Sequence, residues 1–422
     1  MSDTIFALAS APGKAGVSIF RISGSSAQDI AIKLCGNVPI CRGIRVLRYN
    51  GTVLDKALVL SFKQGASFTG EDVVEFHCHG SPAVVATISD SLSAVGARLA
   101  DPGEFTRRAL QNERLDLCQV EGLSDLIEAE TELQRRQAYA LMDGGLTDKV
   151  DRWRASLVRA TALVEVTIDF VDEDVPVDVS VEVNTLISSV VRDLQSEIDG
   201  SFVAERVREG FEVAIIGPPN IGKSTLLNTL AGRQAAITSE IAGTTRDVIE
   251  VRMDLNGIPV TILDTAGLRE TKDKIEELGV VLARKRAELA DLRVFLTLDG
   301  KTIGLGVDPG SDDLVLRGKA DDGGGISGKT GAGLDQMIKH ITRVLGDRVA
   351  FAQSAVRQRH RLAMKDAINY ISQAKKLLAS NGESELIAME LNTALHAMNS
   401  IIGRVGVEDL LDEIFASFCL GK

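Results

Sequence analysis

The residues best suited to chemistry form one continuous run, Gly217-Pro218-Pro219-Asn220-Ile221-Gly222-Lys223-Ser224, which fits G-x-x-x-x-G-K-[ST] at every fixed position. The run follows a strand-like apolar segment, residues 213–216, and precedes a helical one, residues 225–230. In this context glycines let the backbone wrap around phosphates, and amides at a helix start donate to phosphate oxygens. We expect Lys223 to reach the β- and γ-phosphates and Ser224 to place its hydroxyl on Mg²⁺. The sequence therefore predicts a nucleoside triphosphate site.

Two downstream segments fit the same chemistry. A strand-like stretch ends in Asp264-Thr265-Ala266-Gly267, where Asp264 would hold Mg²⁺ through water and the Gly267 amide would sense the γ-phosphate. Between the two motifs lies Gly243-Thr244-Thr245-Arg246-Asp247, in which a threonine can close over Mg²⁺ while the γ-phosphate is present. Taken alone, that segment is equally compatible with an ordinary loop. In this order and spacing the three segments indicate a GTPase of the translation-factor-like class.

The segment expected to recognise the base departs from the usual N-K-x-D pattern. Gly318-Lys319-Ala320-Asp321 follows a strand-like stretch, and Asp321 is the residue expected to pair with the guanine N1–H and 2-amino groups. Gly318 stands where asparagine is usual, and losing one or two hydrogen bonds of about 0.5–1.5 kcal/mol each should weaken affinity more than base choice. Ser327-Gly328-Lys329 fits the element whose backbone caps the guanine oxygen. Guanine remains the predicted base.

The residue after the D-x-x-G motif is Leu268, where many GTPases carry a glutamine that orients the attacking water. An apolar side chain cannot do this, so either hydrolysis is slow or another group supplies the polarisation. The candidates are the acidic residues within 270–277 and a monovalent cation held by the Asn220 carbonyl oxygen. Glu276, considered by itself, is more simply a solvated carboxylate at a helix start.

Length and composition limit the protein class. A chain of 422 residues is typical of two or three domains. Its formal charge of −12 argues against general nucleic-acid affinity, although a local basic face could still bind RNA. The five cysteines are scattered without C-x-x-C spacing, which favours reduced thiols in the cytoplasm over disulfides or a zinc site. We see neither a signal peptide nor an apolar run of the roughly 18 residues needed to span a membrane.

Four regions differ in their patterning. Residues 1–118 mix short strand-like runs (17–22, 57–62 and 73–77) with glycine-rich turns, which predicts an α+β domain. Residues 119–210 and 347–422 are helical, and residues 211–346 alternate strands and helices as a parallel sheet requires. In the first helical region the apolar spacing runs on through residues 123–133. The predicted fold is multidomain α/β plus all-α, with a Ras-like P-loop GTPase domain inserted into a helical domain.

With these motifs in order, the chain resembles the tRNA-modifying GTPase MnmE (TrmE) family over essentially its whole length. The resemblance includes the Cys419-Leu420-Gly421-Lys422 terminus, a C-x-G-K ending characteristic of that family. The other matching segments are residues 4–7, 12–17, 21–24, 68–73, 79–80, 102–109, 112–117, 243–247 and 264–269.

The resemblance implies a homodimer built on the N-terminal domain, which would bind a 5-formyl-tetrahydrofolate-type folate as one-carbon donor. Arg21, Glu75, Arg114 and Lys422 stand where that family contacts the folate. Without the resemblance, Arg21 and Glu75 would be interpreted as a charge pair on a strand face. Arg114 replaces a lysine common in relatives, which keeps the charge but changes the geometry. Cys419 would lie near the modification chemistry.

The resemblance also supplies a substitute for the missing glutamine. It implies K⁺ bound by Asn220 and by the backbone carbonyls of Ser239, Ile241 and Thr244, with Thr245 joining Ser224 on Mg²⁺. It assigns to Glu276 the orientation of the attacking water. The remaining residues expected to contact GTP are Ile221, Gly222, Lys223, Thr225, Asp264, Thr265, Ala266, Gly267, Lys319, Asp321, Ser327, Gly328 and Lys329.

The activity implied is K⁺-stimulated GTP hydrolysis coupled to modification of the wobble uridine of certain tRNAs. An aminomethyl or carboxymethylaminomethyl group would be installed at C5 together with an FAD-dependent MnmG-type partner, in a heterotetramer or larger complex. Basic stretches at 135–136, 149–159 and 357–365 are either tRNA contacts or solvated helix faces. Two alternatives stay open: a regulatory GTPase for ribosome assembly without folate chemistry, and a folate-dependent transferase with a decayed GTPase domain.

Overall fold

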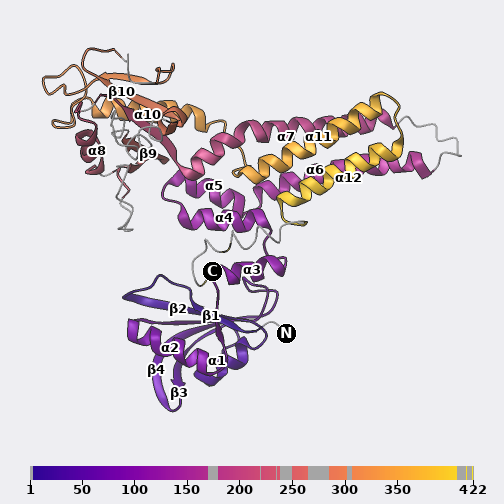
Figure 1. Ribbon diagram of the computed structural model, residues 1–422. Helices are drawn as coiled ribbons and strands as arrows, with labels where there is room; N and C mark the ends of the chain where they lie inside the picture. Colours follow the sequence, from indigo (N-terminus) through magenta and orange to yellow (C-terminus); the bar gives the residue numbers. More distant parts are fainter. Residues whose placement is uncertain are drawn as a thin grey trace, which may run out of the picture. The chain divides into compact units, whose positions relative to one another are not determined.

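The computed structural model describes residues 3–169, 179–218, 220–233, 235–237, 250–264, 285–301, 307–405, 415 and 421. The chain divides into two compact units (Figure 1). The first comprises Met1–Ser124 with Asn399–Lys422, and the second comprises Asp125–Met398. Residues 399–422, which the sequence pattern places at the end of the helical domain, thus group with the N-terminal unit.

The first unit is built on a six-stranded sheet in the order β3-β4-β5-β2-β1-β6. The predicted strands at 17–22, 57–62 and 73–77 are confirmed within β2, β4 and β5. All neighbouring strands pair antiparallel except β1 and β6, which run parallel. The strands are β1 (Ile5–Leu8), β2 (Ala15–Ser23), β3 (Arg42–Tyr49), β4 (Thr52–Phe62), β5 (Val73–Gly80) and β6 (Arg98–Leu99).

One face of this sheet carries the core of the unit. Phe20, Val59 and Phe76 are fully buried there with residues of α1 and α2. Side chains alternate along a strand, so the opposite face carries Ile44 and Leu58, which remain 63% and 38% exposed. The helices of this unit are α1 (Ala27–Cys35), α2 (Pro82–Ala94), α3 (Glu104–Gln111) and the start of α4 (Leu117–Glu128).

The second unit contains a five-stranded sheet in the order β11-β10-β7-β9-β8. Its pairs are parallel, as the alternating pattern predicts, except that β8 runs antiparallel to β9. The exception follows from Asn256-Gly257, whose φ angles of 56° and 87° form the two-residue turn that joins a hairpin. The strands are β7 (Phe211–Ile216), β8 (Glu250–Leu255), β9 (Ile258–Asp264), β10 (Leu292–Thr297) and β11 (Leu314–Arg317).

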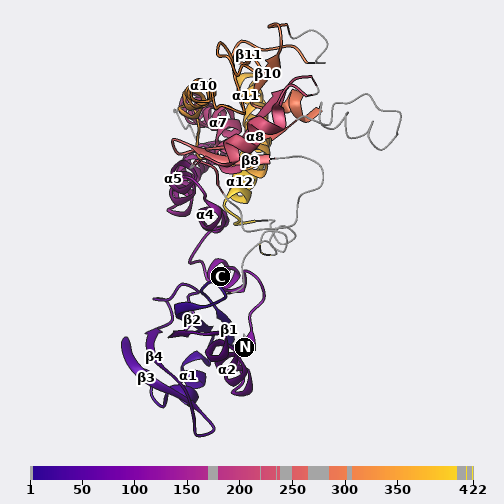
Figure 2. The ribbon, with the colours of Figure 1, turned by 90° about the vertical axis from the view of Figure 1, so that its left-hand side faces the viewer.

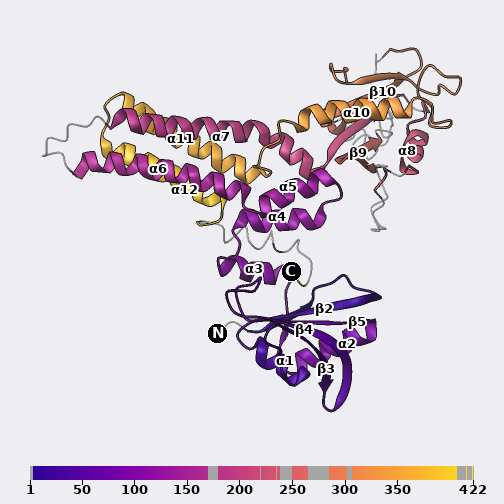
Figure 3. The ribbon, with the colours of Figure 1, turned by 180° about the vertical axis from the view of Figure 1, so that it is seen from behind.

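In the second unit, helices that precede the sheet in the sequence pack against helices that follow it. Figures 1 and 3 show α7 beside α11 and α6 beside α12, and the view in Figure 2 looks along this unit from its sheet end. Lys375 of α11 donates to the Ser188 hydroxyl of α7 at 2.9 Å, and Thr167 of α6 donates to Ser384 of α12 at 3.1 Å. The helices are α5 (Glu132–Met142), α6 (Gly145–Asp169), α7 (Ser180–Glu209), α8 (Lys223–Ala231), α10 (Leu334–Val349), α11 (Gln358–Ala379) and α12 (Ser384–Ile401).

The helical spacing through residues 123–133 belongs to two helices rather than one. α4 ends at Glu128 and α5 begins at Glu132. Thr131 caps the second helix: its hydroxyl accepts from the Gln134 amide, while the Gln134 side chain accepts from the Thr131 amide. This reciprocal capping box satisfies amides that a continuous helix would pair internally, so it starts a new helix. Apolar spacing alone does not reveal the break.

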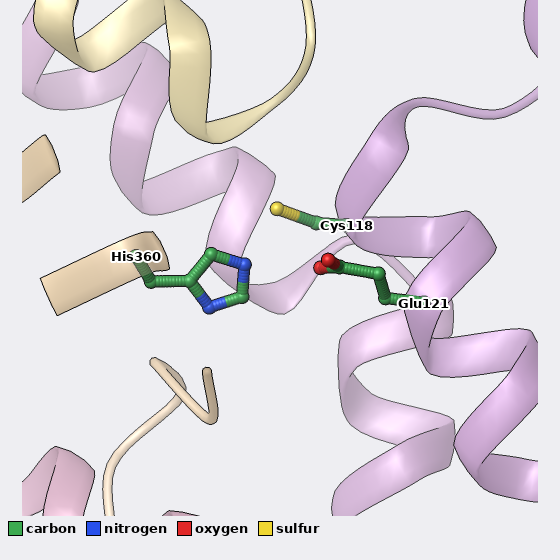
Figure 4. Close-up of side chains that lie close together, drawn as sticks. All are labelled: Cys118, Glu121 and His360. Carbon is green, nitrogen blue, oxygen red and sulfur yellow. The ribbon is translucent and has the colours of Figure 1, made fainter. Parts of the chain in front are cut away.

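The cysteines of the described residues are not disulfide-bonded. These residues are Cys35, Cys41, Cys78 and Cys118. Burial raises the pKa of the Cys78 thiol to about 12. Cys118 lies one turn before Glu121 on α4 (Figure 4), and its Sγ donates to the Ile401 carbonyl at 3.2 Å. Among the described residues no helix is long and apolar enough to cross a membrane.

The contact of α7 with the connector between α10 and α11 predicts a stability effect. At Gly200 of α7, a Cβ would lie 2.5 Å from the Phe351 carbonyl oxygen and would also meet the Gln353 side chain. Backbone atoms cannot retreat cheaply, so we expect Gly200→Ala to lower the free energy of unfolding by about 1–3 kcal/mol. Urea unfolding followed by far-ultraviolet circular dichroism measures this.

Gly346 of α10 is the matched control, because a Cβ added there would have Ile258 Cδ1 as its nearest neighbour, at 3.9 Å. There the intrinsic helix preference of alanine dominates, and Gly346→Ala should raise stability by about 0.5–1 kcal/mol. Equal effects of the two substitutions would contradict the packing argument.

Candidate nucleotide-binding site

The glycine-rich loop after β7 adopts an unusual backbone. Asn220 and Gly222 have positive φ angles of 59° and 105°, and Gly222 is the residue that precedes α8. At Gly217 a Cβ would lie 2.7 Å from the Leu296 carbonyl oxygen of β10, so only glycine fits this close approach. β7 itself is almost entirely buried. A rigid strand, a tightly turned loop and a helix start therefore follow one another, as a phosphate-binding loop requires.

Lys223 is held against this loop. Its Nζ donates to the carbonyl oxygens of Gly217 at 2.7 Å and Pro218 at 3.2 Å, and the residue is buried. The first-turn amides of a helix have no partner within the helix, and the helix dipole adds partial positive charge at the same end. The amine and the start of α8 thus concentrate positive charge at one place, which favours a phosphate.

Ser224 and Asp264 lie together beside the loop. The Ser224 hydroxyl donates to Asp264 Oδ2 at 3.0 Å, which brings the first turn of α8 to the end of β9. Asp264 is buried, and its Oδ1 finds no hydrogen-bond partner among the residues described. A buried carboxylate oxygen without a donor is costly unless a cation or ordered water satisfies it. A hydroxyl and a carboxylate are ligands that suit Mg²⁺, directly or through water.

A cavity of about 470 Å³ opens beside the start of α8. This volume is in the range of small-molecule sites. The predicted residues that it brings together are Ile221, Gly222, Thr225, Lys319, Asp321, Ser327, Gly328 and Lys329. Four further residues line the cavity. Gly318 belongs to the base-recognition segment identified in the sequence, whereas Leu226, Leu296 and Ile326 are not predicted from the sequence. These three side chains are apolar, and they are recognisable only once α8, β10 and the loop after β11 are placed side by side.

Asp321 is oriented by Ser327. The Ser327 hydroxyl donates to Asp321 Oδ1 and accepts from the backbone amides of Lys329 at 3.2 Å and Thr330 at 3.1 Å. Ser327 is buried, whereas Asp321 is exposed. The sequence pattern suggested a role only for the backbone of this segment. The structure adds a side chain that holds the carboxylate in one orientation.

Gly328 packs directly on α8. A Cβ at Gly328 would lie 2.6 Å from the Leu226 amide nitrogen, and the Gly328 carbonyl accepts a hydrogen bond from Thr229. The loop that follows β11 therefore approaches the phosphate-loop helix at backbone distance. This contact explains why glycine, rather than a larger residue, stands between Ser327 and Lys329.

Several predicted residues are not part of this geometry. Asn220 is exposed and is not among the residues that line the cavity. Ser239, Ile241, Thr244, Thr245, Thr265, Ala266, Gly267, Glu276 and Lys422 lie outside the described residues.

A second group of predicted residues lies in the first unit. Arg21 of β2 and Glu75 of β5 are directly opposite in the sheet, and Arg21 Nε donates to Glu75 Oε1 at 2.9 Å. Glu75 Oε2 lies 3.1 Å from His77 Nε2. The Arg21 guanidinium also lies 5.6 Å from the ring of Phe68 and 5.8 Å from that of Phe105, a distance at which cation–π attraction operates.

The strand-face charge pair expected from the sequence is thus present, with His77, Phe68 and Phe105 as unforeseen neighbours. Phe68 and Phe105 are far from Arg21 in the sequence and left no local signal, whereas His77 lies two residues after Glu75 on the same strand face. Arg114 is exposed and packs beside Gly70, where an added Cβ would lie 3.2 Å from Arg114 Cγ.

The role of Ser327 leads to a test. Ser327→Ala removes the donor that orients the Asp321 carboxylate and the acceptor of two loop amides. Each lost hydrogen bond is worth about 0.5–1.5 kcal/mol, so we expect guanine-nucleotide affinity to fall about 5- to 30-fold. Competition with a fluorescent GDP analogue measures the change. Thr330→Ala is the control, since within the described part of the chain its exposed hydroxyl accepts one hydrogen bond, from the Ala332 amide at 3.3 Å. An equal loss in both variants would contradict the assignment.

Two family models match successive parts of the chain, and the second includes residues 399–419, which group with the first unit. The family described as GTP-binding protein TrmE N-terminus matches residues 4–114, and the family described as MnmE helical domain matches residues 117–419. The tRNA modification GTPase MnmE of Roseobacter denitrificans is 56% identical, and that of Paracoccus denitrificans 46%, each covering 100% of both chains. Among solved structures, a variant of Era from Aquifex aeolicus is 29% identical over 31% of this chain and 56% of its own, with a TM-score of 0.25, which is too low to support a structural comparison. On the full-length identity and both domain matches, the chain belongs to the tRNA modification GTPase MnmE family.

Proposed function

We propose that this chain hydrolyses GTP and takes part in modifying the wobble uridine of certain tRNAs. The observation that carries the proposal is the cavity in which Asp321 and Ser327 face the start of α8. One side offers a carboxylate for a guanine base, and the other offers the start of α8 for phosphates. Lys223, in the first turn of the same helix, is held against the phosphate loop outside this lining. In the proposed division, residues 1–118 form the N-terminal domain, 211–346 the GTPase domain, and 119–210 with 347–422 the helical domain that flanks it.

The residues present fit a magnesium ion. Ser224 and Asp264 would hold it, together with Thr245, which lies outside the described residues. When bound, Mg²⁺ would neutralise negative charge on the phosphates. The chain itself would bind the phosphates through the loop amides and Lys223, and would orient the base through Asp321. The segment after β9, with Thr265, Ala266 and Gly267, would contact the γ-phosphate and so sense its presence.

Hydrolysis is proposed to depend on K⁺ because Leu268 offers no polar group. Asn220 would bind K⁺ with the carbonyl oxygens of Ser239, Ile241 and Thr244. Its exposed side chain and its φ angle of 59° are compatible with a loop position from which the amide oxygen is available. Glu276 would orient the attacking water.

The potassium proposal is tested by GTP turnover in KCl and in NaCl at equal ionic strength. We expect turnover at least about tenfold faster in KCl, because a cation at the phosphates can stabilise developing charge by several kcal/mol. Asn220→Ala should remove most of the difference while leaving GDP affinity within about threefold. Equal rates in the two salts for the unsubstituted protein would contradict the mechanism.

In the first unit we propose a site for a 5-formyl-tetrahydrofolate-type folate. Arg21, Glu75, Arg114 and Lys422 would contact it. Support comes from Arg21 of β2, whose guanidinium lies 5.6 Å from the ring of Phe68 and 5.8 Å from that of Phe105 and pairs with the buried carboxylate of Glu75 on β5. Arginine binds carboxylates such as a glutamate tail through paired hydrogen bonds, and aromatic rings stack on a pteridine. Cys419 would lie close to the reacting carbon.

The assembly proposed is a homodimer through the N-terminal unit, joined by an MnmG-type FAD protein in a heterotetramer or larger complex. Exposed apolar side chains on the face of β3 and β4, Ile44 and Leu58, support a protein contact there. Four cysteines that are not disulfide-bonded support a reducing compartment, the cytoplasm.

The basic helical stretches give little support for a particular tRNA surface. Arg135 and Arg136 both pair with Glu132, Arg357 pairs with Asp125, and Arg361 pairs with Glu205. Ion pairs of this kind reduce the net positive potential that a phosphate backbone would meet. These four arginines are therefore interpreted as parts of the helical packing and its solvated faces.

Folate binding discriminates this function from ribosome-assembly regulation. Arg21→Ala should weaken binding of 5-formyl-tetrahydrofolate about 10- to 100-fold, since a hydrogen bond to a charged group is worth about 1.5–3 kcal/mol. Isothermal titration calorimetry measures the change. Arg45→Ala is the matched control, because Arg45 belongs to the opposite face of the sheet and bonds Asn37. Unchanged affinity in Arg21→Ala would contradict the site, and no folate binding by the unsubstituted protein would favour the regulatory alternative.

A further inference from the structure

The space beside Gly318 is closed first by Ile221. The three atoms nearest to a Cβ built at Gly318 all belong to Ile221 of the phosphate loop: Cγ1 at 2.9 Å, Cδ1 at 3.2 Å and the carbonyl oxygen at 3.2 Å. The φ angle of Gly318 lies outside the left-handed region, so the backbone there accepts a side chain. What excludes a side chain at position 318 is therefore Ile221.

Ile221 occupies the junction of three segments. Its Cγ2 would lie 3.1 Å from a Cβ added at Gly217, which opens the phosphate loop. It is 3% exposed and belongs to the same buried cluster as Leu226 of α8 and Leu296 of β10. Ile221 also lines the nucleotide cavity together with Gly318. One side chain thus lies beside Gly217 of the phosphate loop and Gly318 of the loop that carries Asp321, within the buried cluster that includes Leu296 of β10.

From this geometry we propose that Ile221 and Gly318 are a matched pair that positions the base-recognition loop against the phosphate loop. An asparagine at position 318, the usual residue of the N-K-x-D pattern, could connect the two loops by hydrogen bonds. Here an apolar contact of the isoleucine with the glycine backbone takes that place. Ile221 is a positioning residue that acts on guanine-nucleotide affinity through Asp321. The inference rests on the proposed function, because it takes the ligand of this site to be a guanine nucleotide.

The fixed backbone of Gly318 explains why a change at either residue affects the other. Gly318 donates its amide to the Thr297 carbonyl at 2.8 Å, so its backbone is fixed to the end of β10 and cannot move away from a larger neighbour. Truncating Ile221 leaves a void between two loops that each carry ligand-binding groups, and interiors close such voids only in part. Adding a side chain at Gly318 forces Ile221 out of the same space. Each substitution alone disturbs both loops. In the double variant, the side chain added at position 318 fills the space that the truncated Ile221 leaves.

A double-mutant cycle tests the pair. Gly318→Asn, Ile221→Ala and the double variant are compared with the unsubstituted protein by GDP affinity, using competition with N-methylanthraniloyl-GDP at fixed Mg²⁺ and KCl. We expect each single variant to bind GDP at least about tenfold more weakly and the double variant to lie within about threefold of the unsubstituted protein. Losses that multiply in the double variant would overturn the proposal.

Control variants separate positioning from general stability. Ile341 of α10 is fully buried in the same cluster but does not line the cavity. Ile341→Ala should lower the melting temperature, leave GDP affinity within about threefold, and combine with Gly318→Asn without rescue. Where Gly318→Asn does not fold, Gly318→Ala and Ile221→Val give the same cycle with smaller volume changes.

Melting temperatures without nucleotide distinguish failure of the pair from failure of the proposed function. The steric match predicts that the double variant melts higher than Gly318→Asn alone, whether or not the ligand is a guanine nucleotide. If the double variant melts higher than Gly318→Asn but the unsubstituted protein binds no GDP, the proposed function is contradicted. The steric match between Ile221 and Gly318 would then be supported without a role in nucleotide binding. Normal GDP affinity in both folded single variants would overturn the positioning role while leaving GTP hydrolysis intact.

Discussion

The nucleotide site depends on backbone segments that approach one another too closely for side chains. Gly217 meets the end of β10, and Gly328 meets the first turn of α8, each at a distance that a Cβ could not share. These contacts bring loops from distant parts of the sequence to the amino end of a single helix. Because the contacts are made by backbone atoms in a close-packed interior, the loops have little freedom to shift. The placement of Lys223, Asp321 and Ser327 follows from this packing.

A second constraint joins this sheet to the long helices of the same unit. Asp291, just before β10, exchanges hydrogen bonds with the Glu212 backbone of β7 and forms an ion pair with Arg206 of α7 at 3.1 Å. Arg348 of α10 donates to its carbonyl at 2.6 Å. Burial raises the pKa of Asp291 above its ordinary value even beside these arginines. One residue thus fixes where two helices meet the sheet, which makes the helix ends part of the same rigid packing.

The sequence identifies those parts of the site that have local patterns. The phosphate loop, the strand before it and Asp264 each have a local sequence signature, and in the structure Ser224 of the loop donates a hydrogen bond to Asp264 at the end of β9. Ile221 was expected to touch the nucleotide, but its contact with Gly318 joins positions almost a hundred residues apart, and no spacing rule reports it. The same holds for Arg21 with Phe68 and Phe105. The apolar spacing did not predict the break between α4 and α5. Thr131 caps α5 there, although the apolar spacing continues across it.

The hairpin of β8 and β9 links the nucleotide site to the helices that pack against the sheet. It lies between the switch-like segment 243–247 and Asp264, so both of its outer ends lead toward the expected phosphate-sensing residues. Its turn contacts α5: the Gly257 carbonyl accepts from the Leu133 amide at 3.2 Å, and Leu133 packs against the core of the sheet. Arg252 of β8 reaches Glu130 before the same helix at 3.5 Å. Under the proposed function, a change at the phosphates therefore has a short, continuous path of packed backbone to the helices. The hairpin that ends at Asp264 is also the element that α5 contacts.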